Sequence, residues 1–336
     1  MLVSAKVLLG FLLLVLFCYP GSGRAATTPP LVLERTIPLA GVTGRIDHMA
    51  VDLRRKRLFV AELGNGTVDV IDLATGKTVH RIEKLSEPQG IAYAFAADVL
   101  AVASAGDGSV RLFRGDDLLT AGVVDLGDDA DNVRLDPRSG QLVVGYGGGG
   151  LAVLDPVTRS IVRRAPLSAH PEGFQLDVAR SRAFVNVPSG RQIAVLDLAS
   201  GQQLAKWEMP NLTANFPMAL DESDAVIATV FRRPPRLVLL DAQSGAEREN
   251  LATCKDADDV FFDAKRHRIY VSCGEGVVDV FQQVPNGYRK LDRIATKSGA
   301  RTSLFVPELD RLFVAARAGF LGLRSDASIL AFQPEP

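Results

Sequence analysis

Polar and charged side chains recur along the sequence at equivalent positions, directly before or at the start of short apolar segments. Carboxylate and amide oxygens at such positions are ligands that a hard cation such as Ca²⁺ prefers. A histidine there can act as a general base, because its unperturbed pKa lies near neutrality. Groups of both signs can also bind the polar parts of a small molecule or a peptide. The candidate ligand-binding residues are His48, Gln89, Asn132, Glu172, Asp258, Asp259 and Arg301.

The sequence lacks the motifs of nucleophilic and zinc-dependent enzymes. It contains no Gly-x-Ser-x-Gly segment and no histidine pair spaced as His-x-x-x-His. His80 and His267 fall on an outer segment and in a turn, and His170 is expected to pack against the proline that follows it. We therefore predict no catalytic residue, and retain His48 as the one candidate general base. A neighbouring carboxylate, Asp47, Glu172 or Asp259, could tune its pKa.

A repeated unit positions these residues. Its seven copies follow at a step of about 42 residues. The typical unit has a first apolar segment ending near Asp, a second that begins Arg-Leu or similar, and a third close to Val-x-Val-Ile-Asp, followed by a Thr-Gly or Ser-Gly turn and a more polar fourth segment. Period-two alternation, β-branched residues and glycine-rich turns are typical of strands. The sequence therefore predicts an all-β fold, a seven-bladed β-propeller with four antiparallel strands per blade.

The propeller fold gives the candidate residues a common location. The innermost strand of each blade lines a central channel, so the residues that lead these strands converge at its mouth. The rest of each copy is repetitive, whereas this position varies chemically from copy to copy. We expect a ligand site there, and three alternatives stay open: a bound metal, a bound small molecule, peptide or protein, and a polar water-filled channel with no specific ligand.

The two ends of the repeat region predict how the ring closes. Residues 31–39 form a lone strand before the first complete copy, and the last copy stops at Phe332 after its third strand. The N-terminal strand can supply the missing fourth strand of the last blade, which removes an exposed sheet edge. We expect residues 31–336 to form a single propeller domain.

The first 25 residues resemble a secretory signal peptide. Lys6 precedes an apolar run over residues 7–17, and Gly23-Arg24-Ala25 is a small-x-Ala cleavage signal. The run is short for a membrane span, which takes roughly 20 apolar residues. We expect cleavage and a periplasmic or secreted protein without a membrane span, the alternative being an uncleaved anchor. In such an oxidising compartment Cys254 and Cys273, expected at one end of the sixth blade, can form a disulfide.

Composition excludes several classes of protein. Hydrophobic residues make up 47% of the chain, which is enough for a packed core and excludes disorder. The formal net charge of −1 gives no general attraction to nucleic acid, which we do not expect as a partner. The basic segment Arg232-Arg-Pro-Pro-Arg236 is expected to be a solvated loop, with an anion or partner contact as the alternative.

The repeated signature, Arg57-Leu-Phe-Val60 followed by Thr67-Val-Asp-Val-Ile-Asp72 and Ala74-Thr-Gly76, resembles the YncE-like, YVTN-repeat β-propeller family. The resemblance covers nearly all of the chain after residue 25. It implies the propeller fold and carries little information about function, because the repeated residues are structural.

Chains of this type are often labelled gluconolactonase-like, after calcium-dependent lactonase propellers that hold their metal with a Glu, an Asn and an Asp. Asn132, Glu172 and Asp259 match that set by residue type. The blade order differs, because His48 stands where the lactonases carry their metal-binding Glu. We therefore expect an exported binding or interaction module at the channel mouth, with a Ca²⁺-dependent lactonase-type hydrolase at the same site as the alternative.

Overall fold

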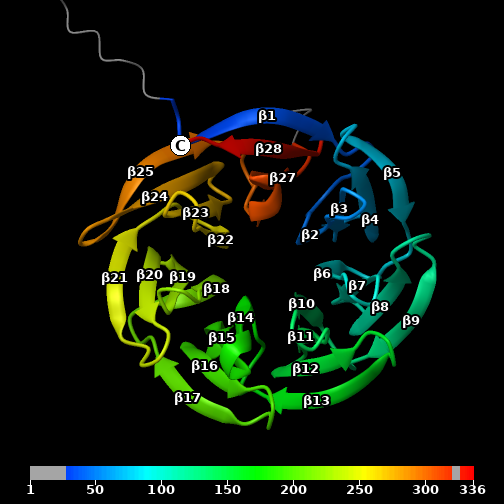
Figure 1. Cartoon of the computed structure of the whole chain (residues 1–336), viewed down its shortest axis with the longest axis horizontal. Coiled ribbons are helices and arrows are strands. Elements are labelled where there is room, and N and C mark those ends of the chain that lie inside the picture. Colours follow the sequence, from blue (N-terminus) through cyan, green and yellow to red (C-terminus); the bar gives the residue numbers. More distant parts are fainter. Residues whose placement is uncertain (1–27, 320–325) are drawn as a thin grey trace, which may run out of the picture.

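Seven four-stranded antiparallel sheets stand around a central channel like the blades of a propeller (Figure 1). The computed structural model describes residues 28–319 and 326–336, so the predicted signal peptide lies outside the described residues. The predicted fold, blade number and strand number are confirmed. Three short 3-10 helices of the described residues, η1 (Val178–Arg180), η2 (Pro188–Gly190) and η3 (Pro307–Leu309), lie in turns between strands. No helix within the described ranges is long and apolar enough to cross a membrane.

In the first six blades the strands follow chain order from the channel to the rim. Their bounds are β2 (Met49–Asp52), β3 (Arg57–Glu62), β4 (Thr67–Asp72) and β5 (Lys77–Ile82) in blade one; β6 (Pro88–Ala94), β7 (Val99–Ser104), β8 (Ser109–Arg114) and β9 (Thr120–Asp125) in blade two; β10 (Ala130–Leu135), β11 (Leu142–Tyr146), β12 (Gly150–Asp155) and β13 (Ser160–Pro166) in blade three; β14 (Phe174–Asp177), β15 (Arg182–Val187), β16 (Gln192–Asp197) and β17 (Gln203–Glu208) in blade four; β18 (Thr213–Asp221), β19 (Val226–Arg233), β20 (Pro235–Asp241) and β21 (Glu247–Ala252) in blade five; and β22 (Ala257–Asp263), β23 (Arg268–Cys273), β24 (Val277–Val284) and β25 (Gly287–Ala295) in blade six.

Blade seven combines both ends of the chain, as predicted. β26 (Thr302–Val306), β27 (Arg311–Ala316) and β28 (Ser328–Pro334) are its inner strands, and β1 (Leu31–Pro38) is its rim strand. β1 pairs antiparallel with β28, from Leu31 opposite Pro334 to Pro38 opposite Ser328. The ring is thereby closed by backbone hydrogen bonds between segments almost 300 residues apart, so the channel geometry depends on this one pairing.

The turn that follows the third strand is capped by an aspartate in four blades. Each of these carboxylates accepts a backbone N–H three residues further on, which satisfies donors that the strand ladder leaves unpaired. In blade one the following glycine, Gly76, has a φ of 67°, a conformation that favours glycine. The four bonds run to Asp72 from Thr75 (2.7 Å), to Asp155 from Thr158 (3.0 Å), to Asp197 from Ser200 (2.8 Å) and to Asp241 from Ser244 (2.8 Å).

The hydrophobic core lies between the blades. Each of seven clusters of buried side chains combines residues of two neighbouring blades, including blades seven and one. Between blades one and two, Phe59 stacks on Tyr93 with ring centroids 5.7 Å apart, and Tyr270 meets Phe305 edge-on between blades six and seven. Because every blade is packed on both faces, the ring holds the loops at its mouth in fixed positions.

Candidate functional site

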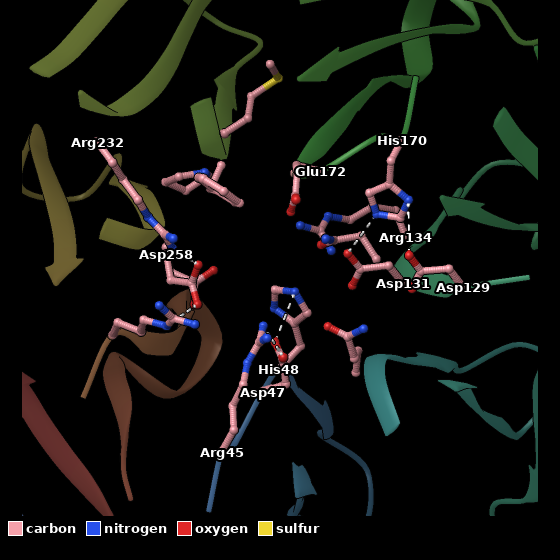
Figure 2. A pocket seen from close by; sticks show the side chains of 18 residues that line it. Arg45, Asp47, His48, Asp129, Asp131, Arg134, His170, Glu172, Arg232 and Asp258 are labelled. Carbon is pink, nitrogen blue, oxygen red and sulfur yellow. Dashed lines mark hydrogen bonds and ion pairs between the residues drawn. The ribbon is translucent and has the colours of Figure 1, made fainter. Parts of the chain in front are cut away.

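All seven predicted ligand-binding residues line one cavity at the channel mouth (Figure 2). The cavity has a volume of about 300 Å³, which is near the lower end of the range for small-molecule sites. The seven predicted residues come from loops and strand starts of six blades, and the full lining draws on all seven blades. The lining consists of Arg45, Asp47, His48, Gln89, Asp129, Asp131, Asn132, Arg134, His170, Glu172, Gly173, Phe216, Pro217, Met218, Arg232, Asp258, Asp259 and Arg301.

Two glycines allow the innermost strands to approach closely at the mouth. A Cβ on Gly90 would lie 2.0 Å from the carbonyl oxygen of Asp131, and one on Gly173 would lie 2.4 Å from that of Phe216. The Gly173 N–H donates to the Phe216 carbonyl at 2.9 Å across the blade boundary. These positions therefore need glycine because a neighbouring backbone occupies the space that a side chain would take.

The side of the mouth formed by blades five to seven is internally charge-paired. Asp258 accepts from both Arg232 and Arg301, the latter at 2.9 Å. Arg301 also contacts Asp256 at 2.9 Å, and Arg232 lies over the Phe216 ring at 3.9 Å. The charges of this cluster satisfy one another, so it forms a rigid wall rather than a set of free ligand-binding groups.

The blade-one residues form a second, smaller group of charges. Arg45 contacts Asp47 at 2.7 Å, and the imidazole of His48 lies 3.6 Å from the other oxygen of that carboxyl. Burial raises the pKa of Asp47. Burial alone would lower the pKa of His48, but the carboxylates of Asp47 and Asp259 outweigh it and raise that pKa. His48 is thereby held toward its protonated form, which donates hydrogen bonds, rather than toward the free base.

His170 lies between two carboxylates of the blade-three loop. Its ring nitrogens are 3.5 Å from Asp129 and 3.6 Å from Asp131, and Nδ1 lies 2.7 Å from the Gly147 carbonyl oxygen. The contact with Asp131 is the main reason that the pKa of His170 rises to about 9. These ionic contacts of the ring nitrogens compensate both carboxylates.

Three polar side chains of blades two to four face the same cavity without a partner among the described residues. Gln89 and Glu172 make no side-chain hydrogen bond there, and the Oδ1 of Asn132, whose side chain is 3% exposed, has no donor. Burial raises the pKa of Glu172 to about 8, so its carboxyl retains a proton at neutral pH and can donate as well as accept. Buried polar groups normally have hydrogen-bond partners, so the unpaired Oδ1 of Asn132 is available to a ligand, with the half-buried side chains of Gln89 and Glu172 beside it in the same cavity.

His48, Arg134 and Asp259 line both this cavity and a second cavity of about 450 Å³ further along the innermost strands. Burial raises the pKa of Asp259 to about 7, and one of its oxygens accepts the Ser303 N–H at 2.7 Å. The second cavity contains many more apolar side chains, such as Phe262. These three residues lie at the boundary between the polar mouth and the more apolar channel, a boundary called the waist below.

The predicted calcium ligands fit a metal only in part. The oxygens of Asn132 and Glu172 are free, but Asp259 is already held by Ser303 and faces the positive charge of His48. Within residues 28–319 and 326–336 no three His, Cys, Asp or Glu side chains are grouped to hold a metal ion. The donor set as it stands does not match the several carboxylate oxygens that Ca²⁺ takes.

The site and fold together define a β-propeller with a polar cavity at one channel mouth. No protein-family model matches the chain, and no curated protein matches it. Among solved structures, a chain in the crystal structure of the mitotic checkpoint complex aligns over 98% of both chains with a TM-score of 0.77 and 14% identity. Hydrazine synthase of Kuenenia stuttgartiensis aligns over 88% of this chain and 96% of its own, with a TM-score of 0.70 and 14% identity. At this identity the likeness concerns the propeller fold alone.

Eleven of the eighteen lining residues lie outside the predicted set, among them Arg134, His170 and Arg232. Arg134 stands two residues after Asn132 and His170 two before Glu172, and alternation along an extended chain brings such neighbours to one face. The predicted turn between the second and third strands of blade five is a tight hairpin, since β19 continues to Arg233 and β20 resumes at Pro235. Arg233 is exposed as expected, but the expectation of a solvated side chain is wrong for Arg232. The side chain of Arg232 is 16% exposed and points into the mouth.

Proposed function

We propose that the protein is an exported binding protein that recognises a small molecule at the channel mouth. One observation carries this proposal: the unpartnered groups of Gln89, Asn132 and Glu172 face a single cavity. Leaving a buried acceptor without a donor costs about 1–3 kcal/mol, and a ligand that supplies the donor recovers it. The rigid ring lowers the cost of ordering these groups on binding.

Two features support export. The first 25 residues have the pattern of a signal peptide. Cys254 and Cys273 lie in a disulfide with Cα atoms 6.0 Å apart, and such bonds persist in oxidising compartments. The repeated signature and the closed ring of seven blades are in keeping with the YncE-like family that the sequence resembles.

A calcium-dependent hydrolase of the lactonase type is the second candidate function. The free oxygens of Asn132 and Glu172 favour it, since both are of the type that a hard cation binds. The positive charge of Arg134 at the waist disfavours it, as does the raised pKa of His48 beside Asp47 and Asp259. The binding proposal accounts for both the oxygens and the cations, and is preferred for that reason.

The proposal is tested by equilibrium dialysis of the purified protein against the small-molecule fraction of a cell extract, followed by mass spectrometry of retained compounds. We expect a compound that the wild-type protein enriches and that the Asn132→Ala variant does not. A matched control is Asn250→Ala, on the rim strand β21. Equal retention by the wild type and Asn132→Ala would show that the mouth is not the binding site.

A further inference from the structure

Arg134 is the one cation lining the mouth cavity that has no carboxylate partner among the described residues. Arg45 pairs with Asp47, and both Arg232 and Arg301 pair with Asp258. The guanidinium of Arg134 donates only to the adjacent Val133 carbonyl at 3.0 Å and lies over the Phe174 ring, 5.5 Å from its centroid. Its charge therefore has no direct ion-pair partner within the described ranges, and the carboxyl groups of Asp131 and Asp259 act on it only from a longer distance.

The carboxylates of the cavity are, in contrast, already compensated. Asp47 and Asp258 have arginine partners, and Asp129 and Asp131 flank His170. Asp259 accepts from the Ser303 backbone, and burial raises its pKa to about 7. Glu172 is the remaining carboxyl, and with a pKa of about 8 it is largely uncharged at neutral pH.

Because the cavity carboxyl groups are compensated and Arg134 has no ion-pair partner in the part of the chain that the structure describes, the cavity favours a negatively charged ligand. Burial lowers the pKa of Arg134, but a guanidinium stays protonated in proteins, so its positive charge persists at the waist. An unpaired buried charge is costly, and an anion that reaches it removes that cost. His48 lies at the same waist and is held toward its cationic form.

We propose that the ligand carries an anionic oxygen group, a carboxylate or a phosphate, which binds the guanidinium of Arg134 while its uncharged polar groups meet Asn132 and Glu172. This inference rests on the proposed function and names the chemical class of the ligand. The planar guanidinium can donate two parallel hydrogen bonds to either oxyanion. Asn132 Oδ1 accepts from a hydroxyl or amide, and the protonated carboxyl of Glu172 donates to an oxygen.

The experiment is calorimetric titration of the protein at constant ionic strength with four probes: inorganic phosphate, succinate, glucose and choline. We expect saturable heat with phosphate or succinate, a loss of affinity of about tenfold or more in Arg134→Gln, and none in Arg164→Gln. Arg164 is a matched control because it lies on β13 of the same blade, exposed and over the Tyr146 ring. An anion that binds Arg134→Gln as well as the wild type, or no heat with either anion, would overturn the inference.

The two proposals fail in different ways. Binding of glucose or choline alone, lost in Asn132→Ala, overturns the anion but retains a ligand site at the mouth. Anion binding that Arg164→Gln loses and Arg134→Gln keeps overturns both.

Folding of Arg134→Gln is checked by thermal melting without ligand, where removal of an unpaired charge is expected to leave the midpoint unchanged or raise it. A lower midpoint would mark Arg134 as structural and overturn the inference by itself.

Discussion

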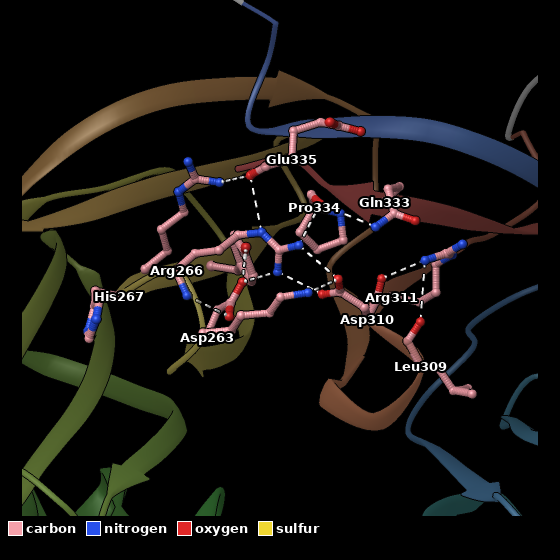
Figure 3. Close-up of polar contacts among 12 residues, drawn as sticks. Asp263, Arg266, His267, Leu309, Asp310, Arg311, Gln333, Pro334 and Glu335 are labelled. Carbon is pink, nitrogen blue, oxygen red and sulfur yellow. Dashed lines mark hydrogen bonds and ion pairs between the residues drawn. The ribbon is translucent and has the colours of Figure 1, made fainter.

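Arg266 and Asp310 join blade six to blade seven through two parallel hydrogen bonds, from Nη1 to Oδ1 at 2.7 Å and from Nη2 to Oδ2 at 2.8 Å (Figure 3). The same guanidinium donates to the carbonyl oxygens of Pro334 and Glu335, at 2.8 and 3.1 Å, and its side chain is 8% exposed. One side chain thus connects the blade-six turn to both the inner part and the C-terminal strand of the closing blade.

Arg266→Ala is expected to destabilise the fold by about 3 kcal/mol, because it removes the two-bond pair with Asp310 and the arginine donor to the Pro334 carbonyl. Lys265 still contacts Asp310, and Arg268 still donates to the Glu335 carbonyl. Chemical denaturation monitored by far-UV circular dichroism measures the loss. Arg114→Ala is the control, since Arg114 forms a surface pair with Asp117 and should leave the midpoint nearly unchanged. Equal effects of the two substitutions would show that the Arg266 contacts do not hold the closure.

The fold could be predicted in detail because its information is local and repeated. Alternation recurs in each copy and the capping aspartate, as at Asp72, recurs in four of them, so the copies corroborate one another. The strand over residues 31–39 revealed the closure because it lacked a copy of its own. Each of these signals lies within a few residues of the structure that it specifies.

The site could be predicted only at the positions directly before or at the start of the innermost strands. Whether a charge there is free or paired depends on residues far away in sequence: Asp258 is compensated by Arg232 and Arg301, 26 residues before it and 43 after it. Alternation along the strand would have added Arg134 to the candidates. No local signal distinguishes its unpaired guanidinium from the paired one of Arg301.

The stability of the protein should fall as the pH rises from mildly acidic to alkaline values. Burial raises the pKa of Glu172 from 4.5 to about 8, so between these values the folded protein holds a proton that the unfolded chain releases. This contribution is complete below pH 4.5 and is lost as the pH approaches about 8. His170, whose pKa is raised from 6.5 to about 9, acts in the same direction at higher pH.

Glu172→Gln should therefore flatten the decline of the melting temperature between pH 5 and pH 8, since glutamine does not titrate. Glu222→Gln, at an exposed turn, should leave the wild-type slope intact. A slope that Glu172→Gln leaves unaltered would mean that this carboxyl is ionised in the folded protein. Melting curves in buffers of matched ionic strength provide the comparison.

The disulfide between Cys254 and Cys273 ties the entry of blade six to the end of its second strand across a separation of 19 residues. For a loop of this length, loop closure entropy predicts a stabilisation of about 3 kcal/mol. The double variant Cys254→Ala, Cys273→Ala should melt earlier by a corresponding amount. Reductant should lower the melting temperature of the wild type and leave the double variant unaffected. A wild type that is insensitive to reductant would contradict a stabilising bond.

Metal removal separates the two candidate functions. If the mouth binds an organic ligand without a metal, dialysis against EDTA should leave the melting temperature unchanged, and titration with Ca²⁺ should release no heat. A calcium-dependent lactonase requires the opposite result, with Ca²⁺ affinity reduced in Asn132→Ala. Lactone hydrolysis that depends on added Ca²⁺ would establish the enzyme and displace the binding proposal.

The two sides of the mouth should respond in opposite ways to substitution. Asp258→Asn leaves Arg232 and Arg301 with only Asp256 as a partner, and breaking a largely buried pair costs about 3 kcal/mol. Asn132→Ala instead removes an acceptor that has no donor, so it should leave the free energy of unfolding unchanged or slightly raise it. Denaturation of both variants, with Asp116→Asn at an exposed site as control, measures the contrast. A large loss in Asn132→Ala would mean that its amide supports the fold, and that the unpaired side of the mouth is not reserved for a ligand.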